Sequence, residues 1–143
     1  MEQDTRGRLE DILDREIEVA HSLAASLAAE RAALTGDSPQ AVEQKATDKI
    51  RIFGLIEKLE TERRSLWATP GAQGLAATVA DRWRTLLELT ARCRVANEIN
   101  GHIIHVRQNQ IRQLLDIVRG GPAITYNPQG KTFARALRAL ARA

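Results

Sequence analysis

Residues 79–118 read VADRWRTLLELTARCRVANEINGHIIHVRQNQIRQLLDIV, and the periodicity of this stretch decides the fold. Positions spaced alternately four and three residues apart fall on one line of a helix, as in helices that pack side by side. The line runs through Val79, Trp83, Leu86, Thr90, Cys93, Asn97, Asn100, Ile104, Arg107, Ile111, Leu114 and Val118. With Leu75 at its start, the pattern predicts one long helix over residues 75–119.

Two earlier stretches repeat the same spacing. The first line predicts a helix over residues 4–35 and comprises Leu13, Ile17, Ala20, Ala24, Leu27, Arg31 and Leu34. The second predicts a helix that begins at Pro39 and comprises Val42, Ala46, Lys49, Phe53, Ile56, Glu60, Arg63 and Trp67. Gly36 ends the first helix, and Ser38 or Asp37 caps the second. A loop this short favours antiparallel neighbours, so we predict an all-α, antiparallel three-helix bundle.

The third helix is much longer than the other two. Residues 75–119 would span about 65 Å, and each of the first two helices would cover about two-thirds of that length. The third helix therefore either overhangs the bundle or breaks, and Asn100-Gly101 is the favoured break point. Gly120-Gly121-Pro122 ends it. We expect a bundle domain over residues 1–121 and a C-terminal tail over residues 122–143.

Composition excludes several classes of protein. The 143 residues include only five aromatic side chains but 22 alanines and 16 leucines, which favours helices and argues against a β-sandwich or barrel. The sequence contains no apolar run long enough to span a membrane, and the acidic start Met1-Glu2-Gln3-Asp4 is unlike a signal peptide, so a cytoplasmic location is expected. Cys93 is the only cysteine, which excludes an intrachain disulfide and a cysteine-clustered metal site.

Charge is unevenly distributed. Residues 1–68 hold 10 basic and 14 acidic side chains, whereas residues 69–143 hold 11 basic and 4 acidic ones. The acidic hairpin can therefore pair with the basic third helix along their flanks. In the tail, Phe133, Leu137 and Leu140 follow helical spacing among basic residues, which predicts a short amphipathic helix. This helix either caps the bundle or orders on a partner protein.

Signals for chemistry are weak. The sequence has no phosphate-binding glycine loop and no nucleophile elbow, so we expect neither an enzyme nor a cofactor. Glu98, His102 and His105 share one helical face with the spacing of metal ligands, but that face points away from the core line, which favours solvated side chains over a metal site.

Asn97 and Asn100, by contrast, fall on the core line, with Gly101 beside them. They indicate either local packing that fixes helix register or a weak point where the helix bends or a partner docks.

The segments Asn97-Glu98-Ile99-Asn100-Gly101 and Thr125-Tyr126-Asn127-Pro128-Gln129-Gly130-Lys131-Thr132 resemble the FlgN family, the type III export chaperones of the bacterial flagellum. The first half is similar in a less specific way, at residues 30–34, at Lys49 and at residues 60–66. The resemblance covers nearly the whole chain. It departs from the family at Asn127, Pro128 and Lys131.

This resemblance implies a function and its sites. FlgN-like chaperones bind the C-terminal helical segments of the hook–filament junction proteins FlgK and FlgL, prevent their premature assembly and deliver them to the export gate. Substrate binding would then map to the tail helix, at Phe133, Leu137 and Leu140 with Arg135 and Arg138. Docking on the gate protein FlhA would map to Tyr126.

Three other functions compete with this one. A basic-tailed helical adaptor could bind nucleic acid through the tail, although the body is nearly neutral and no recognition motif is present. A small helical enzyme or metal sensor would depend on Glu98, His102 and His105 alone. An interfacial membrane helix would have three apolar anchors in the tail, too few for stable insertion.

Overall fold

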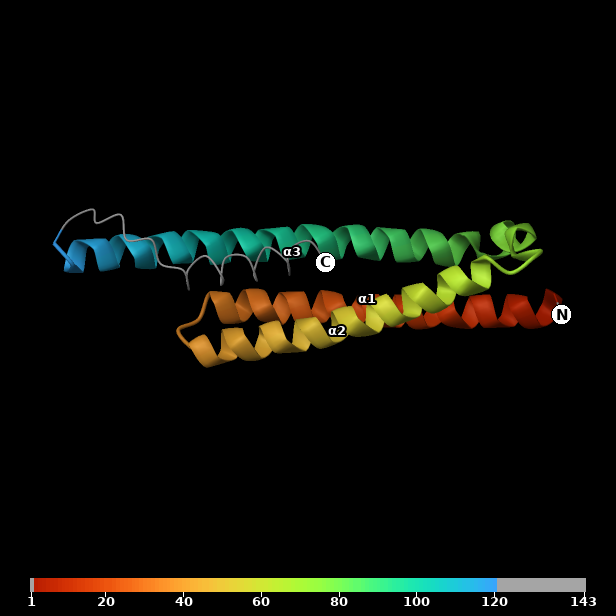
Figure 1. The fold of residues 1–143 in the computed structure, drawn as a ribbon, viewed down its shortest axis with the longest axis horizontal. Coiled ribbons are helices and arrows are strands. Elements are labelled where there is room, and N and C mark those ends of the chain that lie inside the picture. Colours follow the sequence, from red (N-terminus) through yellow and green to blue (C-terminus); the bar gives the residue numbers. More distant parts are fainter. Residues whose placement is uncertain (1, 121–143) are drawn as a thin grey trace.

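The computed structural model describes residues 2–120, which form three helices and one short 3₁₀ turn without any strand. Helix α1 spans Glu2–Leu34, α2 spans Pro39–Trp67, the turn η1 spans Ala72–Leu75, and α3 spans Ala76–Val118. Helices α1 and α3 run in the same direction (Figure 1). Helix α2, which lies between them in the sequence, runs in the opposite direction. The predicted antiparallel three-helix bundle is thereby confirmed. None of the described helices has the apolar stretch that crossing a bilayer requires.

The turn between α1 and α2 follows the capping chemistry of the sequence. Ser38 adopts an extended conformation, and its hydroxyl oxygen accepts a hydrogen bond from the amide of Ala41 at 3.2 Å. Pro39 occupies the first turn of α2, where its missing amide costs nothing. The hairpin is therefore closed by Ser38 rather than by Asp37.

Two glycines with positive φ mark the ends of the later elements. Gly71 has a φ of 86° in the connection after α2, and Gly120 has a φ of 85° two residues after α3 ends. Left-handed backbone of this kind is unstrained only for glycine. The predicted start of the third helix at Leu75 falls on the last residue of η1, so α3 begins one residue later.

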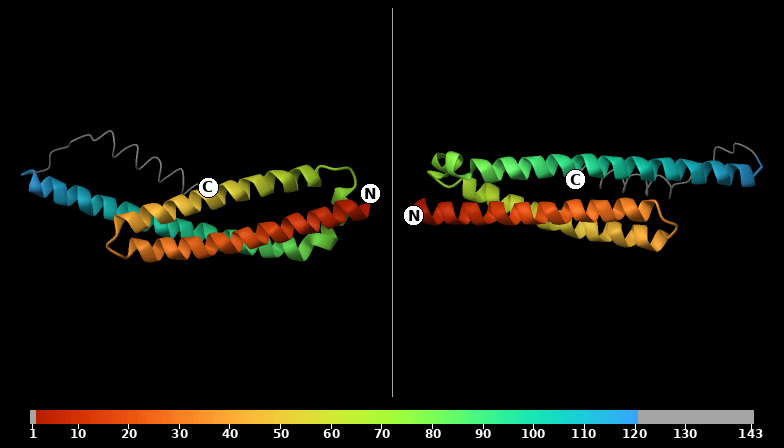
Figure 2. Two further views of the ribbon diagram at one scale, coloured as in Figure 1. Left: turned by 90° about the horizontal axis from the view of Figure 1, so that it is seen from below. Right: turned by 180° about the vertical axis from the view of Figure 1, so that it is seen from behind.

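Helix α1 is the centre of the bundle. It packs against both α2 and α3, whereas α2 and α3 hardly touch each other. From below, α1 lies between the other two helices at the end that holds the N-terminus (Figure 2). One core cluster surrounds Leu9, Leu13 and Leu86, and a second surrounds Leu27 and Cys93. The bundle is therefore open along the face where α2 and α3 would meet.

The buried face of α1 agrees only in part with the predicted line. Leu13, Ala20, Leu27 and Leu34 are buried as predicted, whereas Ile17 and Ala24 are half-buried and Arg31 is exposed. The other buried residues of α1 are Leu9, Ile12, Glu16, Leu23 and Glu30. Glu16 and Glu30 were not predicted there, because a count of apolar residues places them on the surface, whereas each has a cationic partner on α2.

Helix α3 does not break. It continues through Asn100-Gly101 as one helix of 43 residues. The predicted break is therefore wrong, and the third helix overhangs the bundle instead. The last contact with the hairpin is a hydrogen bond that Arg107 donates to the carbonyl of Gly36 at 3.1 Å. Beyond it, residues 108–118 extend about 16 Å past the ends of α1 and α2. The core positions predicted at Ile111, Leu114 and Val118 are exposed because no other described helix reaches them.

Ion pairs join the acidic first helix to the basic third one, as the charge pattern predicts. Arg82 on α3 donates to the Asp14 carboxylate at 2.9 Å and lies 3.9 Å from the Glu10 carboxylate. Solvent screens exposed pairs of this kind, so they orient the helices more than they stabilise them.

Candidate partner-binding surfaces

A groove runs between α2 and α3 on the open face of the bundle. Helix α1 forms its floor through apolar side chains that include Ala20 and Leu23. Phe53 and Ile56 line the α2 wall, and Leu87 lines the α3 wall. Two hollows of about 590 Å³ and 580 Å³ follow each other along the groove and share part of their lining. An apolar groove of this shape can accept the apolar face of another helix.

The hollow nearer the α2–α3 connection is the more apolar one. Trp67 at the end of α2 and Trp83 near the start of α3 both line it, above a floor that includes Leu9 and Leu13. Trp83 lies on the predicted core line but is exposed, because α2 does not close over it. The two tryptophans of the chain therefore flank the same surface.

Arg63 separates the two hollows. Its Nε donates to both carboxylate oxygens of Glu16, at 2.9 Å and 3.1 Å, and its guanidinium carbon lies 4.7 Å from the centre of the Trp83 ring. The side chain thus joins all three helices. Burial raises the pKa of the Glu16 carboxyl, although the charge and hydrogen bonds of Arg63 oppose the increase.

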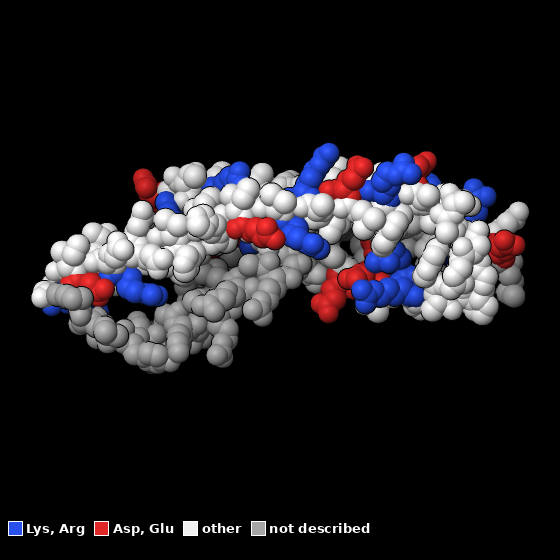
Figure 3. Space-filling model, turned by 90° about the horizontal axis from the view of Figure 1, so that it is seen from above, with Lys and Arg blue, Asp and Glu red and all other residues white. Residues whose placement is uncertain are grey.

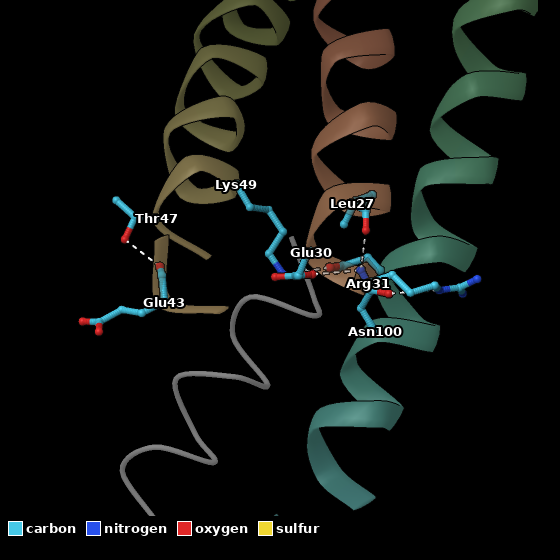
Figure 4. A network of polar contacts seen from close by, with 8 residues as sticks. Leu27, Glu30, Arg31, Glu43, Thr47, Lys49 and Asn100 are labelled. Atoms are coloured by element: carbon cyan, nitrogen blue, oxygen red, sulfur yellow. Dashed lines mark hydrogen bonds and ion pairs between the residues drawn. The ribbon is translucent and has the colours of Figure 1, made fainter. Parts of the chain in front are cut away.

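A buried polar cluster closes the other end of the groove (Figure 4). Lys49 on α2 forms an ion pair with Glu30 on α1 at 3.0 Å and donates to the side-chain oxygen of Asn97 on α3 at 3.1 Å. Asn100 donates to the Glu30 carboxylate and to the carbonyl of Leu27, both at 2.9 Å. Glu30 and Asn100 are each only 1% exposed. The two buried charges are therefore compensated by each other and by amide groups, as burial requires.

The overhang of α3 is a second uncovered surface. In residues 108–118 the exposed large apolar side chains are Ile111, Leu114, Leu115, Ile117 and Val118. Ile117 and Val118 are 74% and 82% exposed. Much of the α3 surface at this end is uncharged in the space-filling view, where it lies on the left (Figure 3). Exposed apolar clusters on a bundle are typical of protein contact sites.

The sequence-predicted residues fall into three groups. Asn97 and Asn100 lie in the buried cluster, and Gly101 is half-buried beside them within α3, so their role in helix register stays a prediction. Glu98, His102 and His105 are exposed, and within residues 2–120 no three His, Cys, Asp or Glu side chains are placed to hold a metal ion. The residues predicted to bind cargo or the export gate all lie in the tail, outside the described residues. They are Tyr126, Phe133, Arg135, Leu137, Arg138 and Leu140.

Cys93 is buried, as its core-line position predicts. Its thiol points to the carbonyl of Ala20, with the sulfur 3.6 Å from the oxygen. Burial raises the pKa of the Cys93 thiol, which suppresses the reactive thiolate. The environment of Cys93 is that of a packing residue.

Sequence reasoning did not find the groove or the Glu30–Lys49 pair. A signal was present, because Lys49 and Arg63 fall on the core line of α2, where an unpaired charge would be costly. Their carboxylate partners, Glu30 and Glu16, lie fourteen residues apart on α1, as Lys49 and Arg63 do on α2. Matching two equally spaced sets of opposite charge on antiparallel helices would have located both pairs.

Comparison with known proteins gives one match. A family model described as FlgN protein matches residues 1–133. The chain belongs to the FlgN family. No curated protein and no solved structure is similar enough to match.

Membership of the FlgN family gives the general role. FlgN is a family of flagellar chaperones, so the chain acts as a chaperone in flagellum biogenesis and protein export. Hook-associated proteins are the partners of the family in general. All of the described bundle and part of the tail, including Tyr126 and Phe133, fall within the matched residues. The apolar groove and the α3 overhang are apolar surfaces that stand open on residues 2–120.

Proposed function

We propose that this FlgN-family chain is a cytoplasmic export chaperone for FlgK and FlgL. It binds their C-terminal helical segments, prevents premature assembly and delivers them to the export gate protein FlhA. The observation that carries this proposal is the FlgN match over residues 1–133, which extends into the tail. The uncovered apolar surfaces add physical support, because amphipathic helices are bound by burying their apolar face.

The proposed substrate site is the tail helix over residues 131–143. Phe133, Leu137 and Leu140 recur at helical spacing and would form the apolar contact, while Arg135 and Arg138 lie elsewhere around the same helix. Tyr126 precedes this segment and is proposed to contact FlhA. One tail would then carry two separate sites, one for cargo and one for the gate.

Co-purification tests the proposal. The C-terminal segments of FlgK and FlgL are each expressed with the full chain and with a version that ends at Gly121. We expect a 1:1 complex with the full chain and none with the shortened one. Binding that survives the truncation would keep the function and move the site to the bundle. If neither version binds either segment, the proposed cargo is wrong.

A substitution pair sharpens this test without shortening the chain. Phe133→Asp combined with Leu137→Asp should abolish binding of the FlgK segment and leave the helical content of the chain unchanged. Ala139→Asp is the matched control, since it adds a carboxylate to the same helix away from the apolar line. A general loss of helicity in the double variant would show that the tail belongs to the core.

A further inference from the structure

We infer that the groove between α2 and α3 is a second docking site, which takes an amphipathic helix of the cargo protein as a fourth helix of the bundle. The inference rests on the proposed function: the groove and the tail hold the same cargo segment together, and neither suffices alone for a stable complex. The groove extends from the Lys49–Asn97 hydrogen bond to Trp67. This length is about 27 Å along α2, which matches a helix of about 18 residues.

The groove has the chemistry of a helix–helix contact with one helix missing. Phe53, Ile56 and Leu87 line it, although none of them is fully buried. The stack of Arg63 on Trp83 crosses it from wall to wall, so an incoming helix would lie over this stack and cover the Trp83 ring. Burying such a surface is favourable by about 25 cal/mol for each Å² of apolar area.

Charges on the walls specify the occupant further. Arg94 and Glu98 line the α3 wall, and neither has an ionic partner within residues 2–120. Glu60 stands on the α2 wall, where Arg64 is its partner. A helix that fits has an aliphatic stripe, an acidic side chain for Arg94 and a basic one for Glu98. These pairs would contribute to orientation more than to affinity.

The length of the linker limits how far the chain's own tail can reach into this groove. About 35 Å of α3 separates Gly120 from Asn97, and about 55 Å separates Gly120 from Trp83. The ten residues 121–130 span at most about 36 Å when fully extended, and they include Pro122 and Pro128. The amphipathic segment 131–143 can therefore reach the near end only when this linker is at full stretch. A helix from another protein has no such constraint and can cover both hollows, which favours it as the occupant.

Tryptophan fluorescence and one matched pair of variants test the inference in the full chain. The probe is a synthetic peptide of the FlgK C-terminal helical segment, with any tryptophan replaced by Phe. Trp67 and Trp83 are the only tryptophans of the chain and both line the groove, so their emission reports its occupancy. Leu87→Asp places a charge in both hollows at a residue that is 50% exposed. Val95→Asp is the control, because Val95 is 55% exposed on the same helix and lines neither hollow.

We expect the peptide to shift the emission of the wild-type chain to shorter wavelength. Leu87→Asp should raise the Kd at least about tenfold and remove the shift, whereas Val95→Asp should change the Kd less than about twofold. If the wild-type chain does not bind the peptide, the proposed function fails with this inference. If it binds while Leu87→Asp behaves as wild type and the emission does not change, the groove site alone is wrong.

Two further outcomes would also overturn the groove site. The tail would be its occupant if Phe133→Asp with Leu137→Asp shifted the emission of the chain in the absence of peptide. A second copy of the chain would be its occupant if the emission and the mass in solution both changed with protein concentration alone.

Discussion

The ammonium of Lys49 lies 3.0 Å from the carboxylate of Glu30 in the core, where 4% and 2% of the two side chains are exposed. Each charge comes from a different helix of the hairpin, and Asn97 and Asn100 bring α3 to the same point. Removing two charges from water is costly, and apolar side chains of similar size would often be as stable. We therefore expect the cluster to contribute mainly by favouring one register of the three helices.

Lys49→Met should destabilise the bundle by about 3–5 kcal/mol, because it leaves the Glu30 carboxylate buried without a cation. Urea unfolding followed by circular dichroism measures the loss. Lys45→Met is the control, since Lys45 forms only a longer, partly exposed contact of 3.9 Å with Asp48. Glu30→Leu combined with Lys49→Met should recover much of the stability. A loss below about 1 kcal/mol in the single variant would contradict a tightly coupled pair.

Glu16 gives the stability of the bundle a specific pH dependence. Burial raises the pKa of its carboxyl in the folded state, so the folded chain binds this proton more tightly than the unfolded chain does. The contribution of Glu16 to the free energy of unfolding is therefore fully present at low pH and is lost as the pH rises through the raised pKa. Glu16→Gln removes this titration.

Urea midpoints of the wild type and of Glu16→Gln, measured between about pH 4 and pH 7, test this effect. The stability of the variant relative to wild type should increase as the pH rises. Glu18→Gln, which makes the same substitution at an exposed position on the same helix, is the control for the loss of one negative charge. A difference for Glu16→Gln that decreases with rising pH would show that the ion pair with Arg63 outweighs burial.

Periodicity predicted the three helices and their boundaries closely, because hairpin caps and glycine stops are local chemistry. It could not predict that Glu16 and Glu30 are buried, because their burial depends on cations from another helix. The open groove could not be predicted from the sequence either. Apolar residues on facing walls, such as Phe53 and Leu87, look the same whether the walls meet or stand apart. The overhang was one of two predicted alternatives, and only the packed structure distinguishes it from a break.

The overhang of α3 should contribute little to the stability of the bundle. Ile117 is 74% exposed and contacts no other described helix, so Ile117→Ser should change the free energy of unfolding by less than about 0.5 kcal/mol. Leu27→Ala, in the buried core, should cost about 2–5 kcal/mol in the same urea experiment. A loss for Ile117→Ser that approaches the loss for Leu27→Ala would mean that the overhang is covered by packing from the rest of the chain.

Tyr126→Ala should separate the two proposed contacts of the tail. Aromatic side chains often supply a large share of the energy of a protein interface, so its loss should weaken binding to FlhA at least about tenfold. Binding to the FlgK segment should be unchanged, because the proposed cargo residues Phe133 and Leu137 lie further along the tail. Titration calorimetry of the preformed chaperone–FlgK complex with the cytoplasmic part of FlhA measures the first effect, and co-purification measures the second. Tyr126→Phe is the control that keeps the ring. A variant that loses both partners would show that cargo and gate share one site.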